Sequence, residues 1–177
     1  MIPLRRFAAS ALAAAALAGG LGACGGNGDE AFADQALQGT EIKAIEGDLL
    51  PPEFLGLTVA KEDVSGSLAS TKRSYVEATS LYSLRDGDLL QATLQVSRFT
   101  PKAEYSTPRF RNSLLNQIGG TRPRTVRVGD DTVYLTSGTK QQLAVWFRGR
   151  YMLILATRED YPTPRTLIRE ALQVEPT

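Results

Sequence analysis

Apolar and polar residues alternate over residues 76–84 and again over 90–96, and this alternation predicts a β-hairpin. The turn between the two stretches is Asp86-Gly87-Asp88. A three-residue loop centred on Gly87 would pair Leu84 with Leu90 and keep the apolar side chains of both strands on one face. The opposite face is then the wetter side of an antiparallel sheet, lined by Gln91, Thr93, Gln95 and Ser97.

Two segments have helical periodicity, and each begins with Thr-Pro. The first has Thr107 as its cap, Pro108 in its first turn and Gly119 at its end, with a buried stripe of Phe110, Leu114 and Ile118. The second begins at Thr163-Pro164. The pentapeptide 105–109 closely matches 161–165, so two interpretations stay open: two duplicated sheet-then-helix halves, or a common helix-start signal.

Four further strands are expected after the first helix, at 124–128, 132–136, 141–147 and 151–157. The last two are apolar on both faces, so they should be central strands. The folded part begins near Leu49, where Pro51 and Pro52 exclude a helix interior. The sequence therefore predicts a single α+β domain over residues 49–177. We expect an antiparallel sheet of about six strands with both helices packed on one face.

The N-terminus has two arginines, an apolar run over 7–18 that is too short to span a bilayer, and then small residues before Cys24. Leu21-Gly22-Ala23-Cys24 resembles a lipobox, the recognition site of bacterial lipoprotein signal peptidase. The resemblance implies that residues 1–23 are a signal peptide. It also implies that Cys24 carries a thioether-linked diacylglycerol, with acyl chains such as palmitate, and anchors the protein to the outer, extracytoplasmic face of the cell membrane. Abundant arginine and alanine suggest an actinobacterial type of lipoprotein.

Residues 24–48 have the composition of a flexible, acidic tether, and the charge of the chain is divided unevenly. Residues 29–63 hold nine acidic and two basic side chains, whereas residues 64–177 hold ten acidic and sixteen basic ones. Two interpretations are compatible with this division: a solvated spacer, which we favour, or an acidic segment that folds back onto the basic domain.

The composition excludes several kinds of catalytic site. The chain has no histidine and one cysteine, so it cannot hold a Ser-His-Asp triad, a Cys-His dyad or an intrachain disulfide. Acidic pairs such as Asp86/Asp88 and Asp130/Asp131 stand in predicted turns, where aspartate usually bonds to its own backbone. Ser137 and Lys140 have the Ser-x-x-Lys spacing of penicillin-recognising enzymes, but they lie in a hairpin turn. We therefore expect no catalytic residue, metal site or cofactor.

A basic stretch between Arg98 and Arg127 is the remaining candidate, and a solvated surface is its simplest explanation. The alternative is a patch that binds anionic lipid, a wall polymer or an acidic protein, whereas nucleic acid is not expected outside the membrane. The candidate residues of that patch are Arg109, Arg111, Arg122 and Arg124. The leading expectation is a lipid-anchored, non-enzymatic domain that binds a partner or ligand. The alternatives are a small carboxylate-dependent hydrolase and a lipid carrier with an apolar cavity.

Overall fold

The computed structural model describes residues 37–38, 42–63, 73–119, 123–138, 141–158, 160, 164–174 and 176 of the chain. The lipobox with Cys24, most of the expected tether, Arg122 and Thr163 lie outside these described residues. Ile42 and Ile45 are buried, so the packed part of the protein includes residues that the sequence analysis assigned to the tether.

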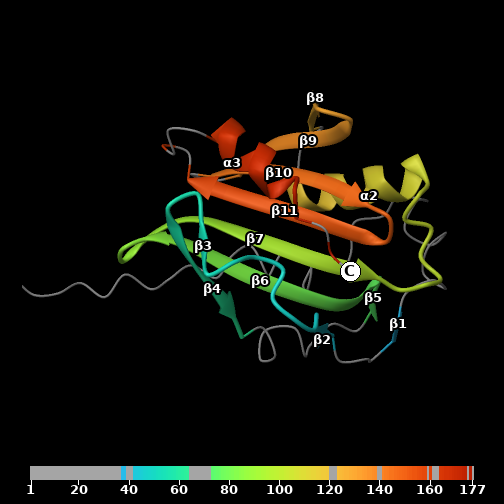
Figure 1. The fold of residues 1–177 in the computed structure, drawn as a ribbon. Coiled ribbons are helices and arrows are strands. Elements are labelled where there is room, and N and C mark those ends of the chain that lie inside the picture. Colours follow the sequence, from blue (N-terminus) through green and yellow to red (C-terminus); the bar gives the residue numbers. More distant parts are fainter. Residues whose placement is uncertain are drawn as a thin grey trace, which may run out of the picture.

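Within the described residues, the domain is built on one large β-sheet with two helices, which confirms the α+β class (Figure 1). The sheet has nine strands, in the order β3-β4-β6-β7-β11-β10-β9-β8, with the short β2 pairing parallel to β6. The expected number of about six was too low, because β2, β3 and β4 are short or exposed and show little alternation. The strands are β2 (Lys43–Ala44), β3 (Glu53–Phe54), β4 (Leu57–Glu62), β6 (Val76–Asp86), β7 (Leu89–Phe99), β8 (Arg124–Val128), β9 (Asp131–Gly138), β10 (Gln141–Arg148) and β11 (Tyr151–Arg158). A separate two-stranded sheet joins β1 (Leu37–Gln38) to β5 (Arg73–Ser74).

The two helices, α2 (Pro108–Gly119) and α3 (Pro164–Ala171), pack on opposite faces of the sheet, so the expectation of a single covered face was wrong. Trp146 and Leu153 share a core cluster with α3, whereas their chain neighbours Val145 and Met152 share another with α2. Successive side chains of a strand point to opposite faces, so the two clusters lie on opposite sides. The central strands β10 and β11 are apolar on both faces, and each face therefore requires a cover.

The Thr-Pro signal places the start of the first helix correctly. The amide of Phe110 donates a hydrogen bond to the hydroxyl of Thr107 (3.3 Å), which is the expected cap. Strands β3, β4, β6 and β7 precede α2, and strands β8 to β11 precede α3, so the two halves share an order of elements. Their helices nevertheless cover opposite faces, and duplication stays an interpretation of the sequence.

The register of the β6–β7 hairpin differs from the expected one. Asp86 pairs with Leu89 across a two-residue turn, and a β-bulge then brings Leu84 opposite Ala92 rather than Leu90. The bulge restores the common apolar face that a three-residue loop was expected to provide. Gly87 has a positive φ of 55° at the first turn position, as a type II′ turn requires.

The polar face of this hairpin is less wet than expected. Gln95 and Ser97 are buried, and so is Thr79 on the neighbouring strand. The Thr79 hydroxyl donates to the Val96 carbonyl (3.0 Å) and lies 3.1 Å from the Ser97 hydroxyl, which accepts a hydrogen bond from the Gln95 amide (3.0 Å). These mutual bonds lower the cost of burying polar groups.

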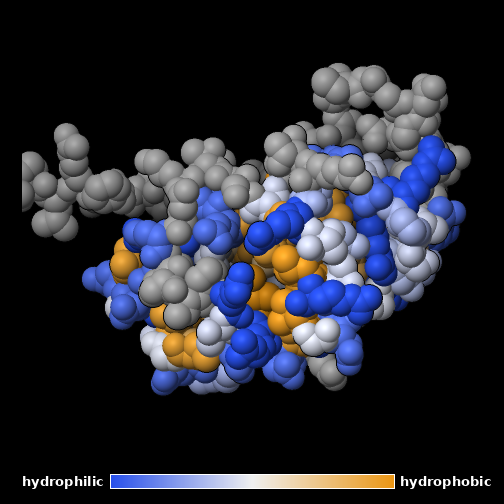
Figure 2. Space-filling view, turned by 90° about the horizontal axis from the view of Figure 1, so that it is seen from above, coloured by the Kyte–Doolittle hydropathy of each residue, from blue (hydrophilic) through white to orange (hydrophobic). Residues whose placement is uncertain are grey.

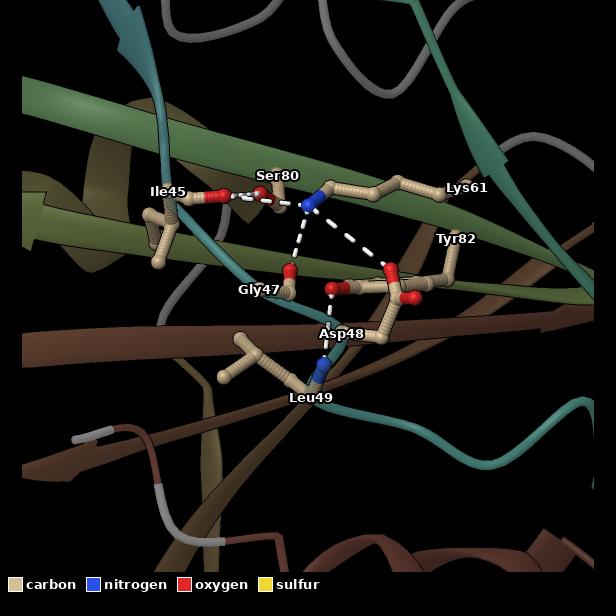
Figure 3. Close-up of polar contacts among 7 residues, drawn as sticks. All are labelled: Ile45, Gly47, Asp48, Leu49, Lys61, Ser80 and Tyr82. Carbon is tan, nitrogen blue, oxygen red and sulfur yellow. Dashed lines mark hydrogen bonds and ion pairs between the residues drawn. The ribbon is translucent and has the colours of Figure 1, made fainter.

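The segment that enters the domain is fixed to the sheet by a set of polar contacts around Lys61, which we call the Lys61 clamp (Figure 3). The ammonium group of Lys61, on β4, donates to the carbonyls of Ile45 (3.0 Å) and Gly47 and lies 3.9 Å from the Asp48 carboxylate. The amide of Leu49 donates to the buried hydroxyl of Tyr82 (3.0 Å) on β6. The chain therefore joins the sheet before Leu49, at the level of β2.

One turn residue is strained, and the strain leads to a stability prediction. Leu55 and Gly56 join β3 to β4 with positive φ angles of 55° and 75°, the geometry of a type I′ turn, which favours Asn-Gly. A left-handed conformation costs an ordinary residue about 1–2 kcal/mol, and Leu55 is exposed, so little packing offsets that cost. We expect Leu55→Asn to raise the free energy of unfolding by about 1 kcal/mol, measured by thermal or urea unfolding.

Leu89→Asn is the matched control for Leu55→Asn, because Leu89 is equally exposed but lies in a strand. Among the described residues other than glycine, Leu55 alone has a positive φ, so the gain should be confined to it. An unchanged or lower melting temperature for Leu55→Asn would contradict the assignment of the turn.

Candidate functional site

A pocket of about 350 Å³ lies on the α3 side of the sheet, over strands β8 to β11. Its floor is a row of cross-strand neighbours, since Leu155 pairs with Ala144, Ala144 with Leu135, and Leu135 with Arg124. Leu155 and Ala144 are buried, Leu135 is half-buried and Arg124 is exposed. The small side chain of Ala144 leaves space between its two leucine neighbours. Polarity along this row therefore changes from the apolar core to a cation at the surface.

Helix α3 forms another wall of the pocket through Ile168, which is buried, and Arg165, which is exposed. These residues are three apart, so they lie on one side of the helix. Gln142 and Thr157 are cross-strand partners and add polar groups to the lining, which Leu143 and Thr136 complete. Figure 2 views the side on which α3, β8 and β9 lie and shows an apolar area bordered by hydrophilic side chains.

The two arginines of the pocket differ in their electrostatic partners from four other arginines that lie in or next to the sheet strands. Arg98 and Arg150 both pair with Glu77, and Arg148 pairs with Asp131 at 3.0 Å. In contrast, neither Arg124 nor Arg165 forms an ion pair within the part of the chain that the structure describes. Two cations at the rim of an apolar pocket give it a positive potential, which favours an anionic ligand.

Arg158 and Asp160 form an ion pair where β11 leads towards α3. Arg158 donates two hydrogen bonds to the carboxylate of Asp160, from Nε (2.9 Å) and from a terminal nitrogen (2.7 Å). These bonds lower the pKa of Asp160 below its ordinary value, because they stabilise the charged carboxylate. The Asp160 carboxylate therefore already has a cationic partner in Arg158.

The arginines that the sequence singled out are distributed over both sides of the sheet. Arg109 and Arg111 lie on α2, whereas Arg124 lines the pocket on the α3 side and Arg122 is outside the described residues. Arg111 donates to the carbonyl of Tyr105 (2.7 Å), and its guanidinium lies 4.9 Å from the centre of the Phe147 ring. Arg111 is thus held by local contacts on its own side of the sheet. Arg124 does not join Arg109 and Arg111 in one patch; it lines the pocket together with Arg165.

Arg165 and the polar residues Gln142 and Thr157 were missed by the sequence analysis. The matching pentapeptides contain Arg109 and Arg165 at the same place, just after Thr-Pro, and Arg165 precedes an apolar residue by three positions. That spacing could have indicated that Arg165 and Ile168 lie on the same side of the helix. Gln142 and Thr157 carry no signal of their own, because their relation depends on the pairing of β10 with β11.

The chemistry of the lining suits binding. The residues that line the pocket in the described part of the chain include no carboxylate, thiol or phenol, and their charged groups are the guanidiniums of Arg124 and Arg165. Among the same described residues, no three acidic or cysteine side chains come together in a way that would hold a metal ion. Nor does any described helix have both the length and the apolar character needed to cross a membrane.

Comparison with known proteins leaves this geometry as the principal guide to function. No family model, no curated protein and no solved structure matches the chain.

Proposed function

We propose that this protein is a lipid-anchored binding protein of the bacterial cell envelope. Cys24 carries the anchor on the outer face of the cell membrane, and the α+β domain binds a small ligand without transforming it. The observation that carries the binding role is the pocket of about 350 Å³ between α3 and strands β8–β11. Its volume falls within the range of roughly 300–1,000 Å³ for small-molecule sites.

The pocket favours a ligand-binding domain over the carboxylate-dependent hydrolase that the sequence left open. A glycosidase-type mechanism needs two carboxylates that face each other, and the described lining offers two guanidinium groups instead. The apolar floor of Leu155, Ala144 and Leu135 supports the carrier alternative in a limited form. A volume near the lower end of the usual range suits one compact molecule rather than a lipid with two long chains.

The binding role can be tested with N-phenyl-1-naphthylamine, a neutral apolar dye whose fluorescence rises when it leaves water. The protein is the chain from residue 24 with Cys24→Ser, which keeps every described residue and needs no detergent. We expect saturable binding of one dye molecule, and we expect Ala144→Phe to weaken it at least tenfold, because the ring would fill the space above the floor.

Ala60→Phe is the matched control, since Ala60 is exposed on β4 and does not line the pocket. Leu135→Trp provides a second block from a half-buried position if Ala144→Phe does not fold. Dye binding that is not saturable, or that both blocking variants retain at full strength while remaining folded, would refute a ligand site in this pocket.

A further inference from the structure

The structure also points to the kind of ligand. Building on the proposed binding role, we infer that the pocket selects a single-chain amphiphile with a compact anionic head, either a carboxylate or a phosphate. The apolar chain lies along Leu155, Ala144 and Leu135, and the head is bound by Arg124 and Arg165.

Polarity changes in one direction across the pocket, from its apolar interior to its charged rim. The cross-strand row begins at Leu155, which is 1% exposed, and ends on the edge strand β8 at Arg124, which is exposed. On α3, the same order recurs from Ile168, which is 8% exposed, to Arg165. Two separate elements thus place an apolar residue inside and a guanidinium outside. A ligand that satisfies both ends has an apolar body and a negative head.

The two guanidinium groups at the rim favour a negatively charged head. Arg124 and Arg165 form no ion pair with any carboxylate that the structure describes, while Arg98, Arg148, Arg150 and Arg158 each form one. The planar guanidinium presents parallel donors that match the oxygens of a carboxylate or phosphate. A cationic head would meet two like charges, and a neutral head would leave both guanidiniums without a charged partner.

The volume of the pocket limits the size of the ligand. A pocket of about 350 Å³ lies near the lower limit for small-molecule sites of roughly 300–1,000 Å³. One alkyl chain of moderate length fills such a space, whereas two long chains would leave most of their surface in water. The inference is therefore restricted to single-chain ligands.

The test is displacement of bound N-phenyl-1-naphthylamine by four compounds that each carry one ten-carbon chain, used below their micelle concentration or solubility limit. Decanoate and decyl phosphate carry the anionic heads, while decanol and decyltrimethylammonium provide the neutral and cationic heads. We expect both anions to displace the dye at concentrations at least tenfold lower than the other two. The stronger of the two anions then distinguishes a fatty-acid carboxylate from a phosphate head.

The arginines are tested by the double variant Arg124→Gln/Arg165→Gln. We expect its affinity for the better anion to fall about tenfold, with little change for decanol or for the dye itself. The matched control is Arg127→Gln/Arg169→Gln, which removes two exposed arginines from the same strand and helix that do not line the pocket. It should bind the anion as the parent protein does.

Two results would overturn the inference. One is displacement by decanol or decyltrimethylammonium at the same concentration as by the anions. The other is anion binding that the pocket double variant retains in full, or that the control double variant loses to the same degree. Both leave dye binding intact, so they are distinct from failure of the proposed function, in which the dye itself finds no saturable site.

Discussion

Leu153→Ala is expected to lower the free energy of unfolding by about 2–5 kcal/mol, and Trp146→Ala by about 3–5 kcal/mol. Both side chains are fully buried, and they face each other across β10 and β11 in the core cluster that α3 covers. Their removal takes apolar area out of the core and leaves a cavity that the surrounding strands cannot fill. Losses of this size are a large part of the roughly 5–15 kcal/mol by which a domain is stable.

Urea unfolding followed by circular dichroism measures these losses directly. Leu89→Ala is the matched control for Leu153→Ala, since Leu89 is 48% exposed and should change stability by less than about 0.5 kcal/mol. Equal unfolding midpoints for Leu153→Ala and Leu89→Ala would show that β11 is not a central strand.

Cys24→Ser should abolish attachment of the protein to the membrane. The lipobox resemblance implies that lipid is attached to the Cys24 thiol, and the serine hydroxyl cannot form the thioether. Two acyl chains anchor a protein stably, so their loss removes the whole attachment rather than weakening it. We expect the variant either to remain as an uncleaved precursor or to appear outside the membrane fraction.

Cell fractionation and the mass of the N-terminal peptide measure attachment and cleavage separately. Asn27→Ser is the control, because Asn27 lies after the expected cleavage point between Ala23 and Cys24. It should be cleaved, acylated and retained. A Cys24→Ser protein that is processed and retained like the parent would remove the basis for a lipid anchor.

Local signals in the sequence predicted the local elements well. Thr107 and Pro108 placed the start of α2, and the all-apolar stretches around Trp146 and Leu153 identified the central strands. The start of the helix and the apolar strands each depend on residues that are close together in the sequence. The α+β class follows from them, because a two-sided apolar strand and two amphipathic helices can be buried together in few ways.

Features that depend on distant residues were not predictable in the same way. The β-bulge between Leu84 and Arg85 shifts the hairpin register, and periodicity cannot distinguish a bulge from a longer loop. The assignment of helices to faces was missed for a related reason, since α2 and α3 have similar starts but cover opposite sides. Both the hairpin register and the face that each helix covers depend on packing between residues far apart in the sequence.

The pocket could not be predicted from local sequence patterns either, because its residues are far apart in the chain. Its lining comes from four strands and a helix, and its space exists because a small residue, Ala144, stands between Leu155 and Leu135 in neighbouring strands. The basic stretch directed attention to Arg124, but its partner at the rim is Arg165, 41 positions further along the chain. The pairing of the strands and the packing of α3 on the sheet bring the two together.

The Lys61 clamp lies on the path that a pull on the N-terminal segment would take into the domain. If Cys24 carries the proposed lipid anchor, such a pull arises whenever the envelope moves against the domain. That pull would first meet the β1–β5 pairing at Leu37 and Gln38, and then the parallel β2–β6 pairing, with the Lys61 contacts behind it. Because β2 pairs with β6, tension would pass to β6 before it reached β7 and the strands beyond it. The pocket on β8–β11 lies towards the other end of the strand order, away from the strands that would first take the pull of the proposed anchor.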